Sequence, residues 1–161
     1  MIKKSVYLCL MLVISTYLIA CSQSNSSVEK GAIISSDDTS NATIVELMKV
    51  DTKVGNGAIA LKQSNVAVHY SGWIYDDTKE NKKGELFDTS SDLGEPLIFS
   101  LGKQRVIKGW DEGIVGMKVG GKRTLMIPAE MAYGSKRIGT ARTAIPENSA
   151  LVFDVELLQV N

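Results

Sequence analysis

The chain has 161 residues, of which 44% are hydrophobic and 22% are charged. This composition is that of an ordinary globular protein, and the length suffices for one domain with a hydrophobic core. The 18 lysines and arginines balance the 18 aspartates and glutamates, and 16 basic residues remain once Lys3 and Lys4 in the first 20 residues are set aside. A balanced charge of this kind does not favour a nucleic-acid-binding protein.

The N-terminus has the features of an export signal. Lys3 and Lys4 give it a basic start, and an apolar stretch of 15 residues follows at 6–20. A membrane-spanning helix needs about 20 apolar residues, so the stretch is short for a span and has the length of a signal-peptide core. We therefore expect residues 1–20 to be a signal peptide.

Cys21 follows this segment directly. The run Leu18-Ile-Ala-Cys21 resembles the bacterial lipobox, in which the cysteine receives a diacylglyceryl group and becomes the first residue of the mature protein. Cys9 leaves with the signal, so Cys21 has no partner for an intramolecular disulfide. Several acyl chains on one residue give stable membrane anchoring. The resemblance predicts lipidation of Cys21; an ordinary cleaved signal with an incidental cysteine is the alternative.

A polar segment follows the cysteine. Residues 22–43 are rich in serine, asparagine and aspartate and show no hydrophobic periodicity, so they cannot bury enough apolar area to offset their ordering entropy. We expect 21–43 to be a lipidated cysteine with a flexible tether that reaches roughly 25 Å. Ser22, where an aspartate would favour the inner membrane, indicates outer-membrane sorting. The protein is thus predicted to be extracytoplasmic and lipid-anchored, facing the periplasm or at the cell surface.

From residue 44 onward, alternating apolar and polar residues predict strands. The run at 66–74 places Tyr70 and Gly72 on one face and His69 and Ser71 on the other. The closing run at 151–158 alternates in the same way, with apolar residues at 151, 153, 155 and 157. A third strand is expected at 120–127, where Pro128 stops it, and weaker candidates lie at 44–50 and 97–101.

One segment, Lys108 to Met117, has a helical pattern, and its internal Gly109 and Gly113 keep it short. The predicted fold class is therefore α+β. We expect an antiparallel, twisted sheet of about five strands wrapped around one short helix.

The sequence gives little support for a nucleotide-binding site, a metal site or a catalytic nucleophile. The run at 116–123 matches the first seven positions of a phosphate-binding loop, but Arg123 stands where a serine or threonine must hold magnesium, and the run precedes a strand. His69 is the single histidine and sits mid-strand, where a hydrogen-bonded structural role is the simpler interpretation. No nucleophile–base constellation is visible, so we expect neither metal nor cofactor and look instead for an apolar pocket.

Several longer motifs carry a family resemblance. They are Val68-His-Tyr70-Ser-Gly-Trp73, Phe87-Asp88, Leu101-Gly-Lys-Gln-Arg-Val-Ile107-Lys-Gly-Trp110, Tyr133-Gly134 and Leu151-Val-Phe153-Asp-Val-Glu-Leu-Leu158. In this order and spacing they resemble the FKBP family, the macrolide-binding peptidyl-prolyl isomerases. The resemblance covers about residues 44 to 161.

This resemblance implies a set of site residues. Trp110 would form the floor of a pocket on which the substrate proline stacks. The Ile107 N–H and the Tyr133 hydroxyl would hold carbonyls of the bound chain, and the Asp88 carboxylate would lie at the pocket edge. Those with a direct part in catalysis would be Tyr70, Asp88, Tyr133 and Phe153, and the substrate and macrolide contacts would be Tyr70, Phe87, Asp88, Leu97, Val106, Ile107, Trp110, Tyr133, Ile145 and Phe153.

The chain departs from the common family pattern at several points. The loop before Phe87 is longer than in minimal members, with an insertion at 76–84, and Leu93 and Leu97 replace an arginine and a phenylalanine. The smaller Leu97 bears on macrolide affinity more than on turnover. The loop at 135–144 is also longer and more basic, and Ile138 is one candidate for its inward-facing residue.

The resemblance implies a peptidyl-prolyl cis–trans isomerase, or rotamase, that helps exported proteins fold. Its partners would be proline-containing polypeptides, macrolides such as tacrolimus or rapamycin, and the membrane through the lipid anchor. The alternative is a module that binds proline motifs, or a chaperone, with incidental isomerase activity. Because Tyr70 lies on the apolar face of its strand, its hydroxyl needs a partner, for which Asp88 is the candidate.

Overall fold

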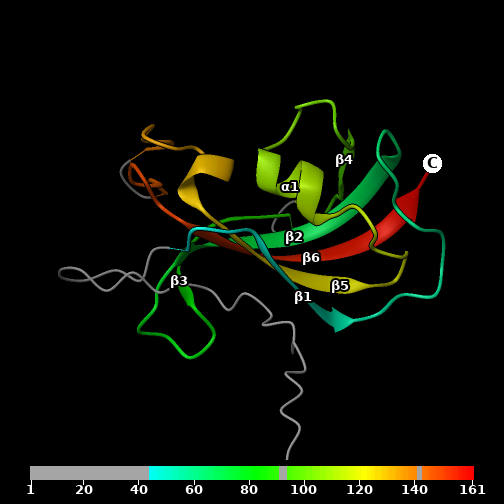
Figure 1. The fold of residues 1–161 in the computed structure, drawn as a ribbon, viewed down its shortest axis with the longest axis horizontal. Coiled ribbons are helices and arrows are strands. Elements are labelled where there is room, and N and C mark those ends of the chain that lie inside the picture. Colours follow the sequence, from blue (N-terminus) through cyan, green and yellow to red (C-terminus); the bar gives the residue numbers. More distant parts are fainter. Residues whose placement is uncertain (1–43, 91–93, 141–142) are drawn as a thin grey trace, which may run out of the picture. The chain divides into compact units, whose positions relative to one another are not determined.

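The computed structural model describes residues 44–90, 94–140 and 143–161, so the predicted signal peptide, Cys21, the tether and Leu93 lie outside the described residues. Strands and helices follow in the order β1 (Met48–Lys53), β2 (Asn65–Tyr75), β3 (Lys83–Thr89), β4 (Leu97–Ser100), α1 (Lys108–Gly113), β5 (Lys122–Ile127), the short 3-10 helix η1 (Ala129–Met131) and β6 (Leu151–Val160). A six-stranded sheet with α1 across one face confirms the α+β prediction (Figure 1).

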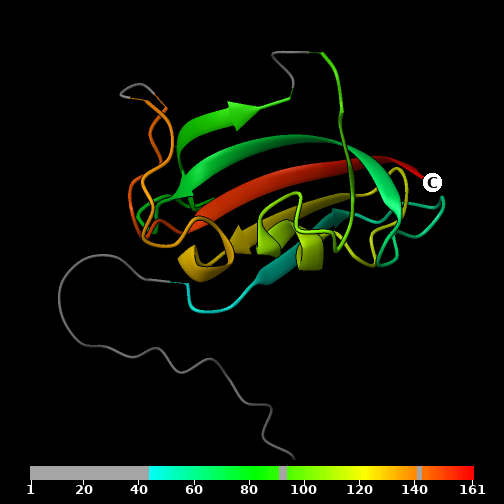
Figure 2. The ribbon, with the colours of Figure 1, turned by 90° about the horizontal axis from the view of Figure 1, so that it is seen from above.

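The sheet is antiparallel, with the strands in the order β1-β5-β6-β2-β3. The short β4 pairs with the first residues of β2, while β3 pairs with the later ones. Figure 2 shows the twist of the sheet from β3 at one edge to β1 at the other. The two longest strands, β2 and β6, therefore lie next to each other and form the centre of the fold.

The predicted alternation holds in these central strands. The register places Gly72 opposite Phe153 and Tyr70 opposite Val155 on the face that α1 covers, which we call the inner face. Ser71 lies opposite Asp154 on the other, outer face. Inner-face residues of β6 at 151, 153, 155 and 157 are at most 4% exposed. The core thus fills the space between the sheet and α1.

Two glycines bring α1 close to β5. A Cβ atom on Gly109 would lie 2.4 Å from Cγ2 of Ile127, and one on Gly113 would lie 2.8 Å from Cδ1 of Leu125. The prediction that the helix continues to Met117 is wrong, because α1 ends at Gly113 and Gly116 adopts a positive φ of +88°. The glycines therefore shorten the helix and also set its distance from the sheet.

Arg123 joins the end of α1 to the edge of the sheet. Its Nη1 donates to the carbonyl of Gly113 at 2.7 Å, and its Nε and Nη2 donate to the two carboxylate oxygens of Asp51 at 2.7 and 3.0 Å. The guanidinium holds the pKa of Asp51 below its ordinary value of 3.8. Arg123 is only 8% exposed, so this pair fixes β1 against β5 and the helix terminus.

The strand missed by the sequence analysis is β3, an edge strand. Its apolar residues, Leu86 and Phe87, are adjacent rather than alternating, and Leu86 is 48% exposed. The first strand was also predicted too early, since β1 begins at Met48 and not at Ile44.

In the part of the chain that the structure describes, no helix is long and apolar enough to cross a membrane.

Candidate functional site

Aromatic side chains from five elements meet on the inner face. The Trp110 ring centroid lies 4.9 Å from that of Tyr70, 5.2 Å from that of Phe153 and 5.8 Å from that of Phe99. Phe87 joins through Phe153, with centroids 5.6 Å apart. Most of these pairs are edge-to-face, an arrangement that the charge distribution of aromatic rings favours. We call these five residues the aromatic cluster.

Gly72 makes room for the cluster in the middle of β2. A Cβ atom there would come within 2.6 Å of Cε1 of Phe153 and 2.9 Å of Cζ of Phe87. Both distances are too short for any side chain, so glycine lets two rings lie directly over the strand. The residue that weakens β2 as a strand is thus the one that allows the cluster to form.

The polar edge of the cluster is built by Tyr70 and Asp88. The Tyr70 hydroxyl donates to Oδ2 of Asp88 at 2.7 Å, which confirms the predicted partner. Burial and, next, this carboxylate raise the pKa of Tyr70 above its ordinary value. The pKa of Tyr133 is also raised, first by burial and then by the charge of Asp88. Both hydroxyls therefore stay protonated at neutral pH and keep a proton to donate.

Trp110 forms the centre of the cluster and faces the sheet. It is 3% exposed, so α1 presents the indole toward the sheet and not at an open edge. Its Nε1 is buried and has no hydrogen-bond partner within the described residues. The indole is therefore the base of the aromatic cluster, and its N–H group has no partner among the described residues.

Apolar residues from two loops flank the cluster. Val106 and Ile107, just before and at the N-cap of α1, pack partly buried against the core. On the other side Ile138 and Ile145 exchange backbone hydrogen bonds of 3.1 and 2.8 Å, and Ile145 is 3% exposed. Ile138 packs against the core as well, as expected for an inward residue of this loop. Tyr133 is half-buried there.

Two residues of β4 differ in burial. Leu97, predicted as a pocket residue, is 38% exposed and lies outside the core, because it starts a four-residue strand at the edge of the sheet. Phe99, two residues later, was not predicted as a site residue, yet its ring contacts Trp110 and it is 8% exposed. The alternation along 97–101 could have pointed to it.

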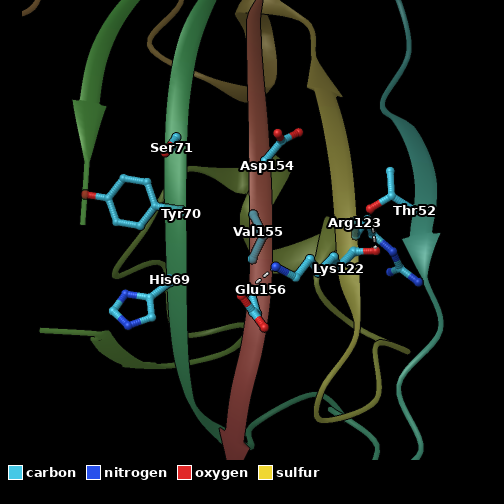
Figure 3. Close-up of a pocket in the computed structure, with 9 residues that line it drawn as sticks. All are labelled: Thr52, His69, Tyr70, Ser71, Lys122, Arg123, Asp154, Val155 and Glu156. Atoms are coloured by element: carbon cyan, nitrogen blue, oxygen red, sulfur yellow. Dashed lines mark hydrogen bonds and ion pairs between the residues drawn. The ribbon is translucent and has the colours of Figure 1, made fainter. Parts of the chain in front are cut away.

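The outer face carries a separate hollow of about 210 Å³ (Figure 3). Its polar side chains pair among themselves and with neighbours: Lys122 with Glu156 at 3.0 Å, and Nδ1 of His69 with Oγ of Ser90 at 3.0 Å. His69 therefore has the structural hydrogen bond that its mid-strand position predicted. Nowhere among residues 44–90, 94–140 and 143–161 do three or more metal-ligating side chains gather. The hollow is therefore a polar surface of the sheet on which these side chains already have hydrogen-bond or ion-pair partners.

Comparison with known proteins gives a consistent picture. The model of the family "FKBP-type peptidyl-prolyl cis-trans isomerase" matches residues 57–158. FK506-binding protein 1 of Aspergillus oryzae is 44% identical over 120 residues, which cover 71% of this chain and 100% of that protein. An FK506-binding protein of Neisseria meningitidis serogroup A is 47% identical over 110 residues, covering 68% of this chain and 92% of the relative. The crystal structure of AtFKBP13 superposes with a TM-score of 0.61 at 39% identity, covering 74% of this chain and 96% of that one.

Proposed function

The chain belongs to the family of FKBP-type peptidyl-prolyl cis–trans isomerases, and we propose that it rotates X-Pro bonds at the aromatic cluster without forming a covalent bond. The observation that carries the proposal is the meeting of four aromatic rings, each from a different element, in the core against which Tyr133 packs; the rings are those of Tyr70, Phe87, Trp110 and Phe153. The family resemblance implied all five residues as contacts of a bound chain, and all five belong to the core cluster or pack against it.

The reaction needs no nucleophile. Rotation about a prolyl amide passes a barrier of about 18 to 20 kcal/mol, because the twisted amide loses its resonance. The planar amide is more dipolar than the twisted one, so an apolar site that excludes water disfavours the ground state relative to the transition state. An acceleration on the order of 10⁵ requires about 7 kcal/mol. Aromatic and aliphatic walls with few polar groups suit that task.

We assign the roles of individual residues within this proposal. The substrate proline packs against Trp110, and the Ile107 N–H and Tyr133 hydroxyl donate to carbonyls of the bound chain. Burial raises the pKa of Tyr133, so its hydroxyl keeps the proton that it donates to the substrate carbonyl. Asp88 already accepts from Tyr70 at 2.7 Å, so its main part is to orient the Tyr70 ring at the cluster edge. Val106 and Ile145 add apolar walls.

We also propose the cellular setting. The resemblance of Leu18-Ile-Ala-Cys21 to a lipobox supports lipidation of Cys21 and export, with residues 22–43 as a polar tether. The substrates are then exported polypeptides, whose prolyl bonds isomerise in tens to hundreds of seconds unaided. Metabolic labelling with a fatty acid tests this, because Cys21→Ser should abolish the label and release the protein from the membrane. An unchanged membrane fraction in the variant contradicts the anchor.

The activity is tested with a Leu-Pro peptide whose cis and trans forms are followed by spectroscopy. The full chain in detergent should accelerate isomerisation, and Trp110→Phe should lower kcat/KM while Lys122→Ala, on the outer face, should not. We expect tacrolimus to inhibit, as the names of the relatives suggest. If the peptide binds without faster isomerisation, the protein is a proline-motif binding module instead.

A further inference from the structure

The connection between β4 and α1 brings Val106 and Ile107 to the aromatic cluster, and little holds it in place. Leu101 at its start is fully buried, whereas the four residues 102–105 are all exposed. The connection then returns to the core at Val106 and Ile107. Val106 and Ile107, on which substrate binding is proposed to depend, are thus connected to β4 by a short stretch that is exposed to solvent.

Asp111 anchors that stretch. Its Oδ1 accepts the N–H of Gly102 at 2.8 Å and its Oδ2 accepts the N–H of Gln104 at 3.0 Å. Within the described part of the chain, these are the hydrogen bonds that join residues 102–105 to the rest of the domain. Hydrogen bonds to a charged acceptor are stronger than those between neutral groups. One carboxylate therefore fixes the whole exposed stretch.

The backbone of the stretch requires such an anchor. Glycine adopts the φ of +73° at Gly102 without strain, but Gln104 has a φ of +55°, and this left-handed region is unfavourable for a residue with a side chain. A conformation of this kind persists where the surroundings hold it. Both left-handed residues have their N–H groups bound by Asp111, so the bonds stabilise the two points at which the chain turns.

We propose that Asp111 is a positioning residue that keeps Val106 and Ile107 in the arrangement that binds the substrate chain; this inference rests on the proposed function. Asp111 follows Trp110 directly in α1. The same helix turn therefore carries the indole of the cluster and the carboxylate that fixes the loop. This links the two sides of the substrate site, the Trp110 base and the Ile107 N–H, in one rigid unit.

The test compares Asp111→Asn and Asp111→Ala with Glu112→Gln in the full chain in detergent. Glu112 is the neighbouring carboxylate, and its Oε1 lies 3.8 Å from Nζ of Lys108, so Glu112→Gln removes the same charge without touching the loop. Asparagine keeps the size of the side chain but offers one oxygen acceptor in place of two, which leaves one of the two N–H groups facing an NH₂ donor.

Loss of the anchor lowers the fraction of molecules in the binding-competent arrangement, and the apparent affinity falls by that fraction. We expect the KM for a Leu-Pro peptide to rise about fivefold to tenfold in Asp111→Asn with kcat unchanged, as for loss of charge-assisted hydrogen bonds at an exposed site. Hydrogen exchange at the Gly102 and Gln104 amides should become faster in both Asp111 variants. Glu112→Gln should behave as the parent.

A parent-like KM in Asp111→Asn together with faster amide exchange overturns the proposal, because the loop would then be free without effect on binding. A fall in kcat at constant KM also overturns it, since that result reports only a smaller folded fraction. If the parent does not isomerise the peptide, the proposed function fails, and the dissociation constant of the same peptide replaces KM in the comparison with the same outcomes.

Discussion

The close approach of α1 to the sheet makes Gly109 a sensitive position. In Gly109→Ala the new methyl group would lie 2.4 Å from Cγ2, 2.7 Å from Cδ1 and 2.9 Å from Cγ1 of Ile127. Ordinary carbon contacts begin near 3.5 Å, so the helix must move away by about 1 Å. Overpacking of this kind costs about 1 to 3 kcal/mol, and the better helix propensity of alanine returns about 1 kcal/mol.

We therefore expect Gly109→Ala to lower the free energy of unfolding by up to about 2 kcal/mol. Because Trp110 is the next residue, the same shift draws the indole away from Tyr70 and Phe153. We therefore expect kcat/KM for isomerisation to fall even under conditions in which Gly109→Ala is still fully folded. Urea unfolding at pH 7 measures the first effect, and kcat/KM for a Leu-Pro peptide measures the second. The close contact makes this outcome specific to the inner side of the helix.

A control and a partner variant complete this experiment. Glu112→Ala, on the exposed side of α1, should change the free energy of unfolding by less than about 0.5 kcal/mol. Ile127→Ala removes all three contacting carbons, so in the double variant the cost of Gly109→Ala should disappear. A Gly109→Ala protein that is as stable and as active as the parent refutes the argument that this glycine sets the position of the helix.

Three other predictions concern the polar groups. Tyr70→Phe removes the hydrogen bond to the exposed Asp88, so we expect the free energy of unfolding to fall by about 0.5 to 1.5 kcal/mol and kcat/KM to fall less than about tenfold. A loss of kcat/KM beyond about 100-fold means that the hydroxyl itself acts on the substrate. Asp51→Asn should cost about 1 to 2 kcal/mol at pH 7, because the Arg123 guanidinium loses its partner. The pKa of Asp51 is lowered in the folded state, so this stabilisation is present above about pH 3.8 and is lost as pH falls through the folded pKa; a difference between parent and variant that stays constant in urea titrations down to pH 2 contradicts it. Isomerisation should vary little between about pH 6 and 8, since Tyr133 keeps its proton there, and a bell-shaped profile in that range speaks against the mechanism.

The central part of the fold could be predicted from the sequence because one physical rule governs it. A strand with one buried face alternates, and β2 and β6 follow that rule with Tyr70 and Phe153 inside and Asp154 outside. The edge strand β3 could not be found in this way. Its residues face solvent on both sides for much of its length, so its sequence has no periodic pattern to show.

The candidate site was predicted from family motifs more than from physical patterns, and particular residues show the difference. Leu97 and Phe99 lie on the same face of the short strand β4, yet Leu97 at its start is 38% exposed and Phe99 is 8% exposed. Trp110 is 3% exposed in the core, so Trp110→Ala would open a large cavity and cost about 3 to 5 kcal/mol. A smaller change such as Trp110→Phe is therefore the better probe of the site.

The central claim is that a prolyl bond rotates in direct contact with the Trp110 indole. The chain has two tryptophans, and the second, Trp73, lies on the outer face with the Lys83 ammonium 4.6 Å from its ring centroid, so it is an internal control. In protein labelled at the indole nitrogens, addition of a Leu-Pro peptide should shift the Trp110 N–H resonance and leave that of Trp73 in place. In the same sample, exchange between the cis and trans signals of the peptide should become fast. Fast exchange with an unmoved Trp110 resonance, or a shift confined to Trp73, contradicts this account.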